Sequence, residues 1–105
     1  MQDLTHYING AHVQGTSGRF ADVMNPATGE VQARVPLAST EEVAQAIEIA
    51  AAAQPAWAAV NPQRRARVLM KFVDLLNRDM DKLAEALSHE HGKTLPVSYT
   101  HLTLP

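Results

Sequence analysis

The residues best suited to metal or proton chemistry in this chain are its five histidines. His89 and His91 flank Glu90, and this spacing turns the two imidazoles to different sides of a helix rather than toward one metal ion. A zinc site of the HExxH type needs histidines at i and i+4, a spacing that the pair does not have. We interpret the pair as the cationic end of a helix, where it complements the helix dipole, and predict no metal site.

A second group of candidates consists of cations that could hold a phosphate. The group comprises Arg64, Arg65, Arg67 and Lys71, and acidic residues follow it closely along the chain. Clusters of this size are typical of a solvated helix face, which is the interpretation we favour over an anion site. The five glycines form neither a G-x-G-x-x-G turn nor a P-loop, and Trp57 fits a core or interface better than a ligand-stacking role. We therefore assign no catalytic, cofactor-binding or metal-ligating residue.

Composition narrows the function further. The chain has 105 residues and no cysteine, which excludes disulfides, thiolate metal sites and a thiol nucleophile within it. Its formal charge is −2, so it has no strongly basic face and we predict no nucleic-acid partner. No apolar run approaches the roughly 20 residues that span a bilayer, and the start is not that of a signal peptide. We expect no membrane partner and a cytoplasmic location.

Turn signals divide the first third of the chain into strands. Asn9-Gly10 predicts a type I′ hairpin over residues 5–14, because both turn positions need a positive φ. Asn25-Pro26 starts a second turn that Gly29 ends, and it separates predicted strands at 20–24 and 31–35. The sequence thus predicts four short antiparallel strands.

Helix signals follow the strands. Ser39 and Glu42 fit a capping box that starts a helix ending near Ala53, with Pro55 stopping or kinking it. Asn61-Pro62 opens a second helix, over 62–78. A third helix, over 80–91, has Asn77 or Asp79 as its alternative caps and Gly92 as its left-handed end. Three helices are therefore expected.

An apolar stripe with 3-4-3-4 spacing leaves two functions open. It predicts either a partner-binding helical module or a core face that packs against a sheet. Val68, Phe72 and Leu75 widen the stripe beyond a two-position seam, which favours the core face. The stripe runs through Ala66, Leu69, Val73, Leu76, Met80, Leu83 and Leu87.

From about Tyr7 to Pro96 the chain resembles the N-terminal part of an aldehyde dehydrogenase. The resemblance is carried by YINGAHV, NPATGEVQARVP, PAWAA and EHGKTL. Within that superfamily, GTSGRF, VQARVPLAS and His91 are most similar to the CoA-acylating methylmalonate-semialdehyde dehydrogenases. The implied fold class is α/β: residues 1–96 form the N-terminal piece of a Rossmann-type fold, with short antiparallel strands followed by three helices, incomplete as a domain.

The resemblance also implies an activity for a longer parent protein. In this family a cysteine attacks the aldehyde, NAD takes the hydride, and the acyl group passes from sulfur to water or, in the CoA-acylating members, to coenzyme A. The parent would be a homo-oligomer acting on a small aldehyde. Because the family's catalytic and cofactor-binding residues lie beyond the point where this chain stops, we expect the 105 residues alone to be inactive.

The last nine residues depart from the family pattern. Residues 97–105, VSYTHLTLP, are rich in Thr, β-branched and aromatic positions, which are poor helix formers. We predict that this tail is not helical and that it is foreign or frameshifted sequence. The predicted organisation is therefore a family segment over 1–96 and a tail over 97–105.

Overall fold

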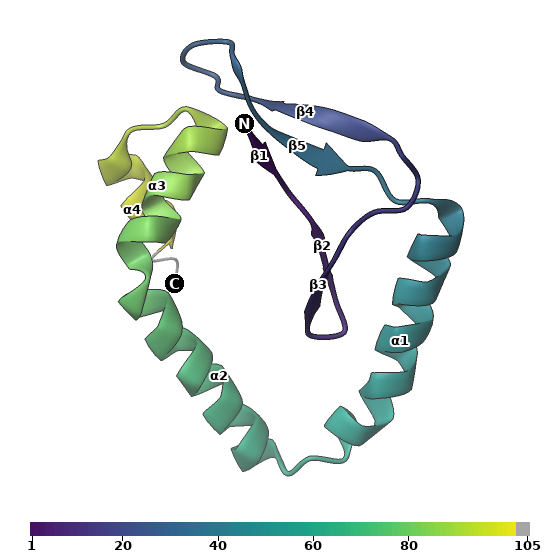
Figure 1. Cartoon of the computed structure of the whole chain (residues 1–105). Coiled ribbons are helices and arrows are strands. Elements are labelled where there is room, and N and C mark those ends of the chain that lie inside the picture. Colours follow the sequence, from purple (N-terminus) through teal and green to yellow (C-terminus); the bar gives the residue numbers. More distant parts are fainter. Residues whose placement is uncertain (103–105) are drawn as a thin grey trace. The chain divides into compact units, whose positions relative to one another are not determined.

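The computed structural model describes residues 1–102, which form parts of two compact units. The first unit comprises Met1–Met24 and Val31–Ala59, and the second comprises Asn25–Glu30 together with the chain from Val60 onward. All the strands and the first helix lie in the first unit, and three further helices lie in the second (Figure 1). The mixed α/β character expected from the sequence is confirmed.

The predicted N-terminal hairpin is present in the first unit. Strands β2 (His6–Ile8) and β3 (Ala11–Val13) pair in antiparallel orientation. Asn9 and Gly10 connect them with φ values of 54° and 75°, the two positive angles that a type I′ turn requires.

A three-stranded sheet forms the rest of the strand structure, in the order β1-β5-β4. Strands β4 (Phe20–Met24) and β5 (Val31–Pro36) are antiparallel, as predicted. Strand β1 (Gln2–Asp3) adds a fifth strand and is parallel to β5, which corrects the expectation of four strands, all antiparallel. Two residues are too few to show an alternating pattern, so the sequence carried no signal for this strand.

Helix α1 (Thr40–Ala58) begins as predicted and ends later than predicted. Its capping box is complete, with Ser39 at the N-cap and Glu42 at the third helical position. Pro55 lies inside the helix and does not stop it, so the predicted end near Ala53 is wrong. A proline removes one backbone donor, and the good helix former alanine surrounds this one; the carbonyl of Pro55 still accepts a 3.1 Å bond from the N–H of Ala59.

The turn Asn25–Glu30 belongs to the second unit and has the predicted chemistry. The side-chain oxygen of Asn25 accepts a hydrogen bond from the N–H of Ala27 at 2.9 Å. Gly29 has a φ of 74° and donates to the carbonyl of Asn25 at 2.7 Å. This closed turn confirms both the asparagine and the glycine assignments.

Helices α2 (Pro62–Arg78) and α3 (Met80–His91) have the predicted bounds. The side chain of Asn61 caps α2, and Gly92 ends α3 with a φ of 79°. Asp79 occupies the N-cap position of α3 without a side-chain cap bond, because its carboxylate binds Arg78 at 2.8 and 3.0 Å. The helix break at Asp79 also interrupts the apolar stripe, so the stripe is not one continuous coiled-coil seam.

A fourth helix, α4 (Leu95–Leu102), contradicts the prediction that the tail is not helical. It packs against α3: Ser98 and Ala84 are both fully buried, and the hydroxyls of Ser88 and Ser98 lie 2.8 Å apart. This burial outweighs the weak helix propensity of the tail residues. The foreign origin of residues 97–105 stays a prediction, and residues 103–105 lie outside the described chain.

Within residues 1–102, no helix is both long enough and apolar enough to cross a bilayer.

Candidate functional site

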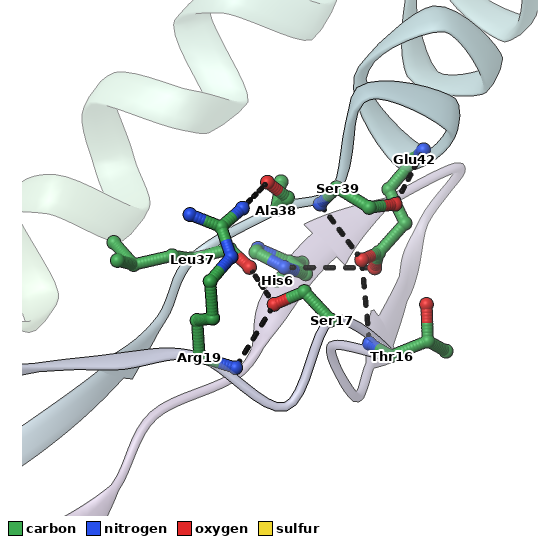
Figure 2. A network of polar contacts seen from close by, with 8 residues as sticks. All are labelled: His6, Thr16, Ser17, Arg19, Leu37, Ala38, Ser39 and Glu42. Atoms are coloured by element: carbon green, nitrogen blue, oxygen red, sulfur yellow. Dashed lines mark hydrogen bonds and ion pairs between the residues drawn. The ribbon is translucent and has the colours of Figure 1, made fainter.

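The densest polar network of the first unit is centred on Glu42, in the first turn of α1 (Figure 2). One carboxylate oxygen of Glu42 accepts hydrogen bonds from the backbone N–H of Ser39 at 3.1 Å and of Thr16 at 3.3 Å. The other oxygen lies 3.8 Å from Nε2 of His6. One side chain therefore joins the helix start, the connector after the first hairpin and strand β2.

A second set of contacts fastens the same connector to the end of β5. The hydroxyl of Ser17 donates to the carbonyl of Leu37 and accepts from the N–H of Arg19 at 3.1 Å. The guanidinium of Arg19 donates to the carbonyl of Ala38 at 3.1 Å (Figure 2). The backbone from Leu37 to Ser39 is thus held on both sides just before α1 begins.

The electrostatics of Glu42 suit a clamp rather than a proton donor. The hydrogen bond from the Ser39 backbone lowers the pKa of the Glu42 carboxyl, with further lowering from Thr16. The carboxylate is therefore ionised at neutral pH, and it lies at the positive end of the α1 dipole. A group of this kind stabilises local structure and does not serve as a general acid.

His6 fits closely between its neighbours. Within residues 1–102 its Nε2 atom is buried and has no hydrogen-bond partner, although it faces Glu42. A Cβ atom on Gly15 would lie 3.3 Å from this nitrogen and 2.8 Å from Cβ of Pro36. Only a glycine allows the connector to approach so closely, so Gly15 is a packing requirement of the network.

The second unit has a hollow of about 540 Å³ beside α3 and α4. The hydroxyl of Tyr99 donates a 2.5 Å hydrogen bond to Asp81 at its edge, and this bond raises the pKa of Tyr99. Tyr99 therefore keeps its proton at neutral pH and is not a nucleophile. Our sequence prediction missed this pair because it treated residue 99 as part of a non-helical tail. The polar residues that line the hollow are Asn25, Asp81, Glu85, Ser88, His89, Lys93 and Tyr99.

The other candidates from the sequence are not assembled into a site. His89 lies 3.7 Å from Glu85 on its own helix, and within the described residues no three His, Asp or Glu side chains gather to hold a metal ion. Trp57 remains 44% exposed on α1. Arg67 and Lys71 border an apolar groove on α2. Neither the Glu42 network nor the hollow pairs a nucleophile with a base, so both organise structure rather than catalyse a reaction.

Comparison with known proteins identifies the class. The sequence profile of the aldehyde dehydrogenase family matches residues 12–103. The chain belongs to the aldehyde dehydrogenase family.

Particular relatives narrow the comparison. The malonate-semialdehyde dehydrogenase of Pseudomonas aeruginosa is 46% identical over 95 residues, covering 90% of this chain and 19% of the relative. The acylating, mitochondrial methylmalonate-semialdehyde dehydrogenase of Arabidopsis thaliana is 44% identical over 96 residues, covering 91% of this chain and 16% of the relative.

A solved structure gives the same result. A candidate methylmalonate-semialdehyde dehydrogenase of Sinorhizobium meliloti 1021, crystallised with NAD, is 60% identical and superposes with a TM-score of 0.91. The match covers 95% of this chain and 20% of that one. The chain therefore spans about a fifth of the length of the relatives it matches.

Proposed function

We propose that this chain is the N-terminal segment of an NAD-dependent, CoA-acylating dehydrogenase of malonate or methylmalonate semialdehyde. The observation that carries the proposal is the 60% identity, at a TM-score of 0.91, to the Sinorhizobium meliloti protein, which was crystallised with NAD. The acylating step is supported by the Arabidopsis relative, whose name includes it. The substrate class is supported by both semialdehyde dehydrogenase relatives.

The reaction proposed for the parent is a two-electron oxidation of an aldehyde to an acyl thioester. A cysteine is needed to form the thioester, and this chain has none. NAD would supply the hydride acceptor. The described residues contain no glycine-rich turn leading into a helix N-terminus, which is how folds of this kind hold a dinucleotide pyrophosphate. We therefore place the catalytic cysteine and the NAD contacts in the rest of the parent.

The part proposed for this segment is structural. The Glu42 network fixes the start of α1 against the N-terminal strands through bonds to Ser39 and Thr16. A rigid scaffold of this kind positions catalytic groups that other segments supply. The proposal further includes a homo-oligomeric, cytoplasmic parent without a nucleic-acid or membrane partner, in keeping with the formal charge of −2.

A chimera tests the proposal. Residues 1–96 of this chain would replace the matching segment of the Sinorhizobium meliloti protein, and NADH formation would be measured with methylmalonate semialdehyde, with and without coenzyme A. We expect CoA-dependent turnover within about tenfold of the unmodified protein, because a compatible scaffold leaves the transition-state contacts intact. A folded chimera that binds NAD and forms no NADH would contradict the proposal.

The chain alone provides the complementary measurement. We expect the 105 residues to form no NADH from the same substrates, because they contain no thiol to attack the aldehyde. Turnover above background would show that the thioester mechanism does not apply to this chain.

A further inference from the structure

Helix α2 carries an apolar face that its own unit leaves uncovered. Four large apolar side chains of this helix are each between 51% and 59% exposed. No described part of the second unit covers them, and α2 has no buried residue at all among residues 62–78. We call these four residues the α2 face: Val68, Leu69, Phe72 and Val73.

The α2 face is continuous. At about 100° of rotation per residue, its four members lie within an arc of about 140°. A groove of about 510 Å³ runs along one side of it, lined by Val68, Phe72 and Leu75 and bordered by Arg67 and Lys71. An arc of this width is broad enough for a core contact and exceeds a two-position helix seam.

The charge of α2 restricts what can cover this face. The helix carries five Arg or Lys residues and one Asp. Arg67 and Lys71 border the groove, so an apolar segment that carries acidic side chains at its edge is favoured there.

The relatives show where such a segment can come from. The backbone of this chain makes up 20% of the Sinorhizobium meliloti chain at a TM-score of 0.91. The remaining four fifths of that chain have no counterpart in this structure. An exposed apolar face on a conserved backbone is explained if part of that remainder packs on it.

We infer that the α2 face is a docking surface for an apolar segment, bordered by acidic side chains, from the remaining part of an aldehyde dehydrogenase chain. This inference rests on the proposed function. Phe72 and Val68 insert into the contact, and Lys71 and Arg67 pair with carboxylates at its edge.

The absence of cysteine allows a direct test. Phe72→Cys would be made both in the 105-residue chain and in the chimera described above, and thiol labelling would be followed at that position by peptide mass spectrometry. Asp74→Cys is the matched control, because position 74 lies on the opposite side of α2. We expect labelling of Cys at position 72 to slow at least tenfold in the chimera, with labelling at position 74 changed less than threefold.

The possible results separate the inference from the proposed function. Equal labelling of the two positions in an active chimera would overturn the docking surface and leave the proposed activity standing. Protection of position 72 in an inactive chimera would support the docking surface and contradict the activity. Protection of position 72 in the isolated chain, rising with concentration in step with dimer formation by sedimentation, would make a second copy the occupant and overturn the inference.

Charge reversal gives an independent readout. In the chimera, Lys71→Glu should lower the thermal unfolding midpoint more than Lys71→Gln, since only the former places a carboxylate beside acidic neighbours. In the isolated chain the two variants should unfold alike. Equal midpoints for the two variants in the chimera would exclude an acidic border.

Discussion

The backbone N–H of Thr16 donates a 3.3 Å hydrogen bond to the carboxylate of Glu42, 26 residues later in the chain. The same carboxylate oxygen accepts from the N–H of Ser39, so one helix cap also holds the connector that follows the first hairpin. A local signal for a helix start thereby becomes a tertiary contact. The stability of the first unit should accordingly respond to changes at this cap more than a simple surface helix would.

Ser39→Ala removes the hydroxyl that accepts the bond from the Glu42 N–H, 3.1 Å away. We expect the first unit to lose about 1 kcal/mol of unfolding free energy, the typical cost of losing an N-cap side chain. Urea unfolding followed by circular dichroism measures this loss. Ser39→Thr keeps a hydroxyl at the cap and should cost less than half as much; equal losses would show that the cap bond is not the cause.

Acid should weaken the first unit through Glu42. Its pKa is lowered in the folded chain, mainly by the Ser39 backbone bond, so folding favours the ionised carboxylate. Its contribution is therefore complete above the ordinary glutamate pKa of about 4.3 and is lost as the pH falls through the lower folded value. We expect the urea midpoint to drop between about pH 5 and pH 3 for the natural chain.

Glu42→Gln supplies the control for this pH dependence. The amide does not titrate, so the variant should be less stable at pH 7 and should lose less stability on acidification. The other carboxylates titrate in both proteins, and the difference between the two curves isolates Glu42. Parallel curves would mean that Glu42 does not contribute to the acid sensitivity.

The sequence predicted those elements whose signals are local. Asn9-Gly10 determines its hairpin, Ser39 with Glu42 determines the start of α1, and Gly92 determines the end of α3. Each depends on a φ angle or a hydrogen bond within about four residues, which is the range that sequence patterns encode. The family membership followed from the same turn and cap motifs.

The remaining features depend on contacts between distant residues. Strand β1 forms only because β5 offers a parallel partner, and α4 is helical while it packs Ser98 against α3. The bond between Thr16 and Glu42 has no sequence pattern at all. Propensity is a weak guide in such places, because burial and pairing outweigh it.

Gly92→Ala should destabilise the second unit for two reasons. The residue has a φ of 79°, which costs a residue with a Cβ about 1–2 kcal/mol. Its new Cβ would also lie 2.9 Å from Cγ of Pro26. Gly18→Ala is the matched control, since Gly18 has a φ of 72° and open space around it. We expect the larger loss of unfolding free energy at position 92; equal losses would remove the contact with Pro26 as a cause.

The packing of α4 on α3 can be tested at Ser98, which is fully buried and lies 2.8 Å from the hydroxyl of Ser88. Ser98→Ala leaves the Ser88 hydroxyl without this partner and should cost about 1 kcal/mol. Ser98→Leu forces a larger side chain into a filled space and should cost about 1–3 kcal/mol.

Val97→Ala provides the comparison for these two variants, because Val97 is 40% exposed on the same helix and its truncation should cost little. Limited proteolysis of residues 95–102 measures the opening of α4 directly, and urea unfolding measures the second unit. If Ser98→Leu were cleaved no faster than Val97→Ala, α4 would not be held on α3, and residues 97–105 would behave as an appendage to the family segment.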